Sequence, residues 1–273
     1  EGEMMAAFET VLRADANAGK VVLVTGGGTG IGKATAAAFV ATGARVAIAS
    51  RRTELLEAAA DELRTIAGGS GQVQVVTADI REPDQVVSLV DAVLAESGHI
   101  DVLVNNAGGQ FGAAAEEIGL KGLRAVHRLN VDATWNLTHE VATRSMIPAR
   151  SGLITFTGFS PRRGIPEYLH SSSARAALEN LASGLSMEWS RYGIRSVCIA
   201  PGNIDTEGLA GYGADAVEQM RRDVPLGRLG LPEEVGQLVA FLASDAGSYI
   251  TGTTIEIDGG MNAWGNTAPP PRD

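Results

Sequence analysis

A glycine-rich stretch near the start of the chain has the residue types and spacing of a phosphate-binding loop. A β-branched run at residues 21–25 leads into Gly-Gly-Gly-Thr-Gly-Ile-Gly at residues 26–32, and an Ala-rich stretch of helical composition follows. Gly26 permits a tight turn, Gly30 lets backbone N–H groups approach a phosphate, and Gly32 lets a helix pack closely on the strand. The N-terminus of that helix presents unpaired donors to a pyrophosphate. We therefore expect a dinucleotide site here. Its residues are Gly26, Thr29, Gly30, Ile31 and Gly32.

The end of the next β-branched run indicates which dinucleotide binds. An acidic residue at this place would bind the adenosine ribose hydroxyls of NAD. The chain has Ser50, Arg51 and Arg52 instead. A guanidinium group is suited to a phosphate dianion. These three residues therefore favour NADPH, although two solvated arginines at a helix start are the alternative.

The elements that must position these residues alternate along the chain. Seven short runs are rich in β-branched residues and have the composition of strands buried on both faces. Longer segments rich in Ala, Leu, Glu and Arg separate them and favour helices. This alternation predicts an α/β fold with a parallel seven-stranded sheet flanked by helices, in a single doubly wound domain of the Rossmann type. The runs are residues 21–25, 46–49, 73–77, 102–104, 153–157, 196–200 and 254–257.

The same pattern sets the expected domain limits. Residues 1–19 form an N-terminal extension with weak periodicity, and residues 20–262 form the domain. Residues 263–273 form a C-terminal tail that ends in Ala-Pro-Pro-Pro-Arg-Asp, a sequence that cannot continue a helix or a sheet.

Composition excludes several classes of protein. The chain has 22 Lys and Arg against 32 Asp and Glu, a net charge of −10, which disfavours nucleic acid and anionic membranes as partners. Its single cysteine, Cys198, excludes an internal disulfide framework. The four histidines lack ligand spacing, so no metal site is expected. No apolar run reaches the ~18 residues of a membrane span, and no signal peptide is evident, so we expect a cytoplasmic protein.

Several motifs, in order, resemble the short-chain dehydrogenase/reductase superfamily. Asp79-Ile80 matches its adenine-contacting position, and Asn106-Ala107-Gly108 matches its fourth-strand motif. Asn130 matches its helix asparagine, a residue of the catalytic site. The resemblance also implies a homodimer or homotetramer, formed through helices at about 123–149 and 171–192 and through the C-terminal strand region. The loop beside the nicotinamide is matched by Pro201, Gly202, Ile204 and Thr206.

A closer resemblance is to the peroxisomal trans-2-enoyl-CoA reductases, in the branch that includes the 2,4-dienoyl-CoA reductases. Residues 106–111, 115–122 and 170–176 carry it. It implies NADPH as the cofactor and a C=C bond of an acyl thioester, bound to CoA or to a carrier, as the substrate. It does not imply peroxisomes, because the C-terminal residues are not a Ser-Lys-Leu address.

The chain departs from the superfamily at the catalytic pair. Most members have a Tyr four residues before a Lys, and alignment puts Ser171 and Arg175 in these two positions. The two residues still share one helix face. Arg175 can donate hydrogen bonds to a ribose hydroxyl, but it cannot relay protons. Ser171 is a candidate oxyanion donor and Tyr168 a candidate proton donor, because reduction of an enoyl thioester produces an enolate rather than an alkoxide.

Three functions therefore remain open. The first is an NADPH-dependent reductase of an activated C=C bond, most simply a trans-2-enoyl thioester. The second is an atypical reductase of a ketone or imine intermediate of small-molecule biosynthesis. The third is a family member that binds the cofactor without catalysing a reaction.

Overall fold

The computed structural model describes residues 10–66, 73–162 and 164–265. Its centre is one seven-stranded sheet in the order β3-β2-β1-β4-β5-β6-β7, and all neighbouring strands are parallel. The predicted fold class is therefore confirmed, and each predicted strand is present within two residues of its predicted limits. The strands are β1 (Val21–Thr25), β2 (Arg45–Ser50), β3 (Val73–Thr77), β4 (Val102–Asn105), β5 (Gly152–Thr157), β6 (Ile194–Pro201) and β7 (Thr254–Ile257).

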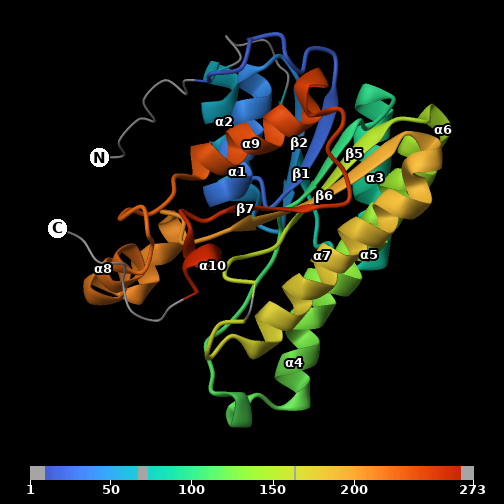
Figure 1. Ribbon diagram of the computed structural model, residues 1–273. Helices are drawn as coiled ribbons and strands as arrows, with labels where there is room; N and C mark the ends of the chain where they lie inside the picture. Colours follow the sequence, from blue (N-terminus) through green and yellow to red (C-terminus); the bar gives the residue numbers. More distant parts are fainter. Residues whose placement is uncertain (1–9, 67–72, 163, 266–273) are drawn as a thin grey trace.

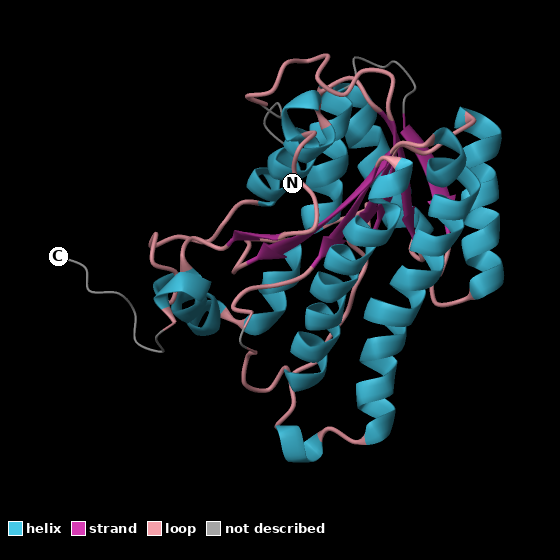
Figure 2. Cartoon of the chain, turned by 45° about the vertical axis from the view of Figure 1, so that its right-hand side comes forward, coloured by secondary structure: helices cyan, strands magenta, loops and turns pink. Residues whose placement is uncertain are grey.

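Helices cover both faces of the sheet (Figures 1 and 2). One buried apolar cluster joins the sheet to α1 (Gly30–Ala41), α2 (Thr53–Ile66) and α9 (Pro232–Ala243). A second cluster joins the opposite face to α3 (Pro83–Ser97), α5 (Ala133–Val141) and α7 (Leu169–Trp189). The inner strands β1 and β4 are buried at every position because each side of the sheet packs against a helical layer, whereas the edge strands β3 and β7 are partly exposed.

The strand order reverses between β1 and β4. In open α/β sheets the loops on either side of such a reversal separate and leave a crevice at the carboxyl ends of the strands. Here Asn106, just after β4, connects the two sides of the reversal: its Nδ2 donates a hydrogen bond to the carbonyl of Thr25, at the end of β1, at 3.0 Å. The crevice therefore lies between the glycine loop and the β4 motif.

A long helical segment follows the β4 loop and lies against α7. It begins with α4 (Leu120–His127), continues through α5 and ends with α6 (Ile147–Ala149). Two wider π-type turns interrupt it, η2 (Arg128–Asp132) and η3 (Ala142–Met146). Such turns are frequent at functional sites, and η2 contains the predicted catalytic Asn130.

Shorter elements complete the chain: η1 (Ala115–Glu117), η4 (Ser190–Tyr192), η5 (Glu207–Tyr212), η6 (Asp245–Gly247), α8 (Ala214–Arg222) and α10 (Met261–Trp264). Figure 1 shows α8 and α10 together, away from the two helical layers. The predicted limit between domain and tail, after residue 262, falls inside α10. Of the predicted extension and tail, residues 1–9 and 266–273 lie outside the described residues.

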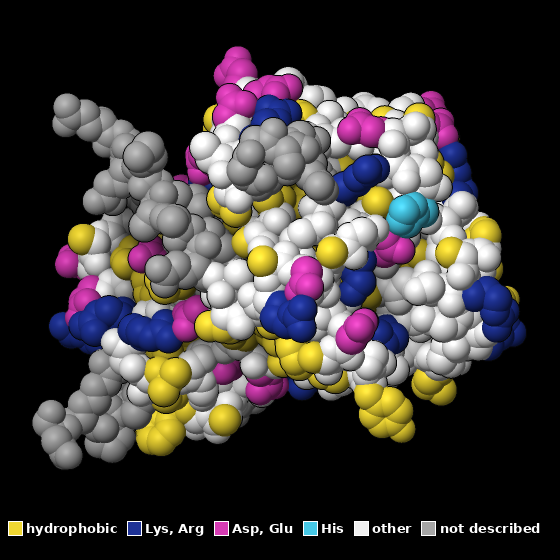
Figure 3. Space-filling view, turned by 90° about the horizontal axis from the view of Figure 1, so that it is seen from above, with side chains coloured by type: hydrophobic (Ala, Val, Ile, Leu, Met, Phe, Trp, Pro, Cys, Tyr) yellow, Lys and Arg dark blue, Asp and Glu magenta, His cyan; other side chains and the backbone are white. Residues whose placement is uncertain are grey.

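The surface carries both signs of charge. In the view of Figure 3, Lys and Arg side chains are interspersed with Asp and Glu. Within the described ranges, no helix is long and apolar enough to cross a membrane.

Candidate active site

The glycine loop between β1 and α1 has the backbone that the sequence requires. Gly26 and Gly30 have φ of +67° and +51°, which disfavours any residue with a side chain. A Cβ on Gly32 would lie 2.2 Å from the carbonyl oxygen of Gly26, so only glycine lets α1 pack against the loop. This close packing turns the N-terminus of α1 toward the crevice and fits a bound pyrophosphate.

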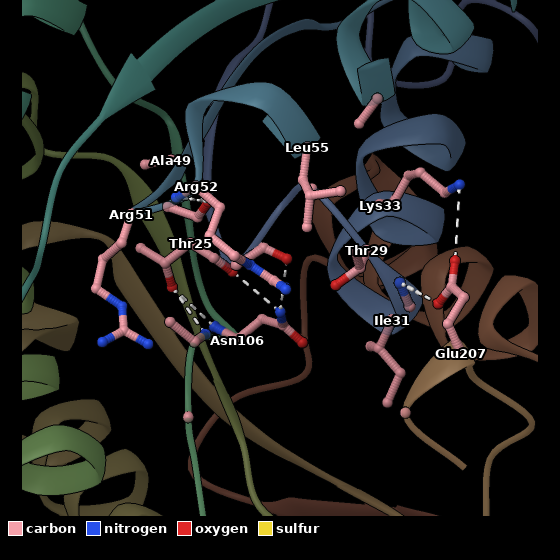
Figure 4. Close-up of a pocket in the computed structure, with 18 of the residues that line it drawn as sticks. Thr25, Thr29, Ile31, Lys33, Ala49, Arg51, Arg52, Leu55, Asn106 and Glu207 are labelled. Atoms are coloured by element: carbon pink, nitrogen blue, oxygen red, sulfur yellow. Dashed lines mark hydrogen bonds and ion pairs between the residues drawn. The ribbon is translucent and has the colours of Figure 1, made fainter. Parts of the chain in front are cut away.

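A first cavity of about 760 Å³ opens along this loop (Figure 4). It extends from the end of β2 to the residues that follow β6. Most of the residues expected to bind the cofactor line it: Gly26, Thr29, Gly30, Ile31, Ser50, Arg51, Arg52, Asp79, Ile80, Asn106, Ala107, Gly108 and Thr206. Gly32 lies beneath the loop rather than on the cavity wall.

The β2 end of this cavity is positively charged. Arg51 and Arg52 are exposed, and neither forms an ion pair with any residue that the structure describes. Ser50 accepts a hydrogen bond from the backbone N–H of Arg52 at 3.3 Å, which holds the turn. Asp79 is bound by the Arg81 guanidinium, whose hydrogen bonds lower the pKa of that carboxyl to about 2. Asp79 is therefore an anion at neutral pH, and its charge is offset by Arg81.

A second cavity of about 840 Å³ adjoins the first, since Ile31, Asn106, Gly108 and Thr206 line both. The four remaining predicted cofactor residues line it: Arg175, Pro201, Gly202 and Ile204. Its wall is largely apolar, with side chains from the loop after β5, from η5 and from α8. These include Phe159, Ile165, Leu209, Tyr212 and Met220.

Arg175 lies at the junction of the two cavities. Its Nη1 donates to the carbonyl of Thr157, and its Nη2 lies 2.2 Å from where a Cβ on Gly108 would stand. Its Nε is shielded from solvent and has no hydrogen-bond partner among the described residues. Desolvation lowers the pKa of this guanidinium to about 10, so it remains a cation at neutral pH. Unsatisfied buried donors of this kind are found at catalytic sites and beside bound water or ions.

Ser171 differs from its expected position. It is fully buried, lines neither cavity, and its Oγ donates to Oε1 of Gln110 at 2.6 Å. Gln110 itself lines the second cavity. With its amide oxygen engaged by Ser171, Gln110 turns its NH₂ group, a donor, away from that bond. Sequence reasoning missed Gln110 as a polar group of the site, although it belongs to residues 106–111, on which the enoyl-CoA reductase resemblance partly rests.

Asn130 is buried behind the β4 loop rather than in a cavity. Its Nδ2 donates to the carbonyls of Gly109 and Val126 at 2.9 and 2.8 Å, and its Oδ1 accepts from the N–H of Gly109 at 3.4 Å. The π-type turn of η2 turns this side chain toward the loop. Asn130 therefore holds the backbone next to Gly108, against which Arg175 packs.

Tyr168 lines the second cavity just before α7. Its phenol shares a hydrogen bond with the phenol of Tyr212 in η5. This bond and the partial burial of the ring raise the pKa of Tyr168 to about 12. The phenol is therefore protonated at neutral pH and weakly acidic. Within the described residues, no cluster of acidic, His and Cys side chains could hold a metal ion.

Comparison with known proteins agrees with this geometry. A family model described as enoyl-(acyl carrier protein) reductase matches residues 26–262. The chain belongs to the short-chain dehydrogenase/reductase family. This short-chain dehydrogenase/reductase is 39% identical to a Caenorhabditis elegans protein named "Probable 2,4-dienoyl-CoA reductase 3", over 92% of this chain and 83% of that one.

Two further relatives show the range of the family. A 3-oxoacyl-acyl-carrier-protein reductase of Chlamydia trachomatis is 37% identical, over 89% of this chain and 97% of its own length. The crystal structure of a 3-ketoacyl-(acyl-carrier-protein) reductase from Brucella melitensis, complexed with NADH, superposes with a TM-score of 0.83. It is 27% identical, and the match covers 90% of this chain and 99% of that one. The chain is thus an oxidoreductase of a family that binds nicotinamide cofactors.

Proposed function

We propose that this short-chain dehydrogenase/reductase is an NADPH-dependent reductase of an activated C=C bond, with a trans-2-enoyl thioester as substrate. The proposal rests on the position of the catalytic pair. The Tyr and Lys of most family members are absent there, and Arg175, whose Nε is unpaired, takes the place of the Lys. The name of the C. elegans relative supports the substrate class.

A reduced nicotinamide supplies a hydride when bound, and the residues lining the first cavity together with Arg175, Pro201, Gly202 and Ile204 would hold it. Arg51 and Arg52 would bind a 2′-phosphate, since guanidinium groups suit a phosphate dianion and these two form no ion pair within the described part of the chain. These two residues support NADPH over NADH.

The chain's own donors suit an enolate. Gln110 and Arg175 both line the second cavity, where a thioester oxygen would gain charge as the C=C bond is reduced. A preorganised donor of this kind stabilises such a transition state by ~3–4 kcal/mol. Ser171 orients Gln110 through the 2.6 Å hydrogen bond, and Asn130 holds the loop that carries Gly109. Tyr168 is the proposed proton donor to Cα, either directly or through water.

Reduction of a carbonyl makes a heavier demand on the site. Its product is an alkoxide that needs a proton at once, and the Tyr and Lys that relay this proton in most of the family are replaced here by Ser171 and Arg175. The Chlamydia relative is named as a 3-oxoacyl reductase, so ketoreduction is the second candidate.

Turnover of matched substrates tests the proposal. Purified protein receives NADPH with a trans-2-enoyl-CoA, or with the 3-oxoacyl-CoA of the same chain length, and nicotinamide absorbance and product mass are followed. We expect kcat/KM for the alkene to exceed that for the ketone by at least ~100-fold, since a lost proton relay costs ~10²–10⁴ in rate. A faster ketone, or NADPH binding without turnover of either compound, contradicts the proposal.

A further inference from the structure

A carboxylate of the chain itself lies at the N-terminus of α1. Oε2 of Glu207, the first residue of η5, accepts a hydrogen bond from the backbone N–H of Gly30 at 3.0 Å. Its Oε1 is 3.8 Å from Nζ of Lys33. Figure 4 shows Glu207 beside Thr29 and Ile31, at the opposite end of the cavity from Arg51. Thr206 also packs against Gly30: its methyl group lies 3.3 Å from where a Cβ on Gly30 would stand.

This is the place where the glycine loop would hold a pyrophosphate. The first N–H groups of a helix lack partners within the helix and attract an anion. Thr29, the residue before α1, makes no capping hydrogen bond with its side chain. Glu207 therefore supplies an anionic acceptor from a segment 177 residues away. A carboxylate and a pyrophosphate cannot occupy the same N–H group, and their charges repel.

We propose that Glu207 is a latch that occupies the pyrophosphate position of the free protein and leaves Gly30 when a dinucleotide binds. The inference rests on the proposed dinucleotide site, but it needs neither the alkene substrate nor a preference for NADPH.

The latch connects the two cavities. Glu207 begins η5, and the same short element carries Leu209 and Tyr212 over the second cavity. η5 is thus attached to the glycine loop at Gly30 through Glu207, and its Tyr212 lines the second cavity together with Tyr168. α8, which follows it, has no buried residue, so moving this segment costs little apolar contact. Release of Glu207 on dinucleotide binding therefore frees η5 from the glycine loop.

The structure offers a matched control for the charge of Glu207. Lys33 forms its shorter ion pair with Glu62 of α2, at 3.1 Å. Glu62 lines the same cavity and is also exposed, but it binds Lys33 rather than Gly30. Glu62→Gln therefore removes one negative charge near the loop and keeps the carboxylate that contacts Gly30, while Lys33 stays beside Glu207.

Dinucleotide binding by Glu207→Gln and Glu62→Gln tests the latch. NADPH, NADH and adenosine 2′-phosphate, which lacks a pyrophosphate, are titrated by calorimetry, and association rates are measured by stopped-flow fluorescence. We expect Glu207→Gln to bind both dinucleotides roughly two- to fivefold tighter, mainly through faster association, because a charge at an exposed helix N-terminus stabilises by this much. Adenosine 2′-phosphate should bind the wild type and both variants equally.

Three results would overturn the latch. They are unchanged or weaker dinucleotide binding by Glu207→Gln, an equal gain for Glu62→Gln, or an equal gain for adenosine 2′-phosphate. Because Glu207 is exposed, its replacement should not alter folding, which an unchanged unfolding curve would verify. If the wild type bound no nucleotide at all, the dinucleotide site itself would be wrong, which is a different outcome from failure of the latch.

Discussion

Two arginines of this protein show how differently the same side chain can be used. Arg195 donates to the carbonyls of Leu242, Gly247 and Ile250 at 2.7 to 3.1 Å, so it joins β6 to the segment after α9. Arg175 has one backbone acceptor and an unpaired Nε beside the cavities. The first arrangement is structural. The second leaves binding capacity for a ligand.

We predict that Arg175→Met and Arg195→Met separate function from stability. Arg175→Met should lower turnover by ~100-fold through the loss of a preorganised donor. It should change the free energy of unfolding by less than about 1 kcal/mol, because removing a desolvated cation offsets its lost bond. Arg195→Met should lower the free energy of unfolding by about 2–4 kcal/mol, because three partly buried backbone carbonyls lose their donor. Urea unfolding and steady-state kinetics measure both. Equal destabilisation by the two variants would make Arg175 structural.

Arg51 should determine the choice between cofactors. We expect Arg51→Ala to weaken NADPH binding by roughly ten- to a hundredfold, as the loss of a charged hydrogen bond does, and to leave NADH within about twofold. Arg45→Ala, at the other end of β2, is the matched control because that side chain is also exposed. Calorimetric titration with the two cofactors measures the ratio. A parallel loss for NADH would show that Arg51 does not contact a 2′-phosphate.

The contribution of Tyr168 to the free energy of unfolding should depend on pH in the alkaline range. Its pKa is raised to about 12, so its interactions favour the folded state below the ordinary tyrosine pKa of ~10. That contribution is lost as the pH rises from ~10 through about 12. We predict that the excess stability of the wild type over Tyr168→Phe is constant below pH ~10 and shrinks above it. Urea unfolding at several pH values measures this difference, and a difference that grows with pH would contradict the assigned hydrogen bond.

At the scale of elements, the β4 loop depends on the π-type turn of η2. The turn directs Asn130 at the backbone of Gly109, and this places Gly108 against Arg175. The helix and the loop therefore form one unit of the site.

Removal of the Asn130 side chain should loosen this unit. We expect Asn130→Ala to lower the free energy of unfolding by about 1–3 kcal/mol, because buried carbonyls lose a donor, and to weaken cofactor binding as well. Asn136→Ala on the same helical segment is the control, since Asn136 is only half-buried. Urea unfolding and nucleotide titration measure the two effects. Full cofactor affinity in Asn130→Ala would show that the loop holds its shape without this clamp.

At the scale of the whole molecule, an exposed apolar face lies on the long helices. Trp135 of α5 is 39% exposed and stacks on Trp189 of α7, and Met187 of α7 is 78% exposed. The family resemblance implies a homodimer or homotetramer through these helices. This assembly remains a prediction.

We expect Trp135→Glu combined with Met187→Glu to reduce the mass of the assembly, because two buried charges oppose the contact. Val11→Glu is the control, because Val11 lies outside these helices and is 91% exposed. Light scattering after size-exclusion chromatography measures the mass. An unchanged mass in the double variant would show that the interface lies elsewhere, for example at the β7 edge.

The sequence by itself determined the sheet and the glycine loop. Strands that are buried on both faces are apolar along most of their length, so the run at 21–25 identified β1 with its observed limits. Gly26 and Gly30 identified the loop because their positive φ values exclude other residues. Such features depend on the residue's own conformation or on a local pattern.

Only the tertiary structure decided which polar groups face the cavities. Ser171 turns to Gln110 across 61 residues, and Glu207 reaches Gly30 across 177. Tyr168 pairs with Tyr212 from a different element. The direction of a side chain in these cases depends on what distant segments place beside it, because buried donors and acceptors are satisfied wherever a partner lies. A linear sequence does not contain that proximity, so it indicates candidate residues for a site but not the partners of their side chains.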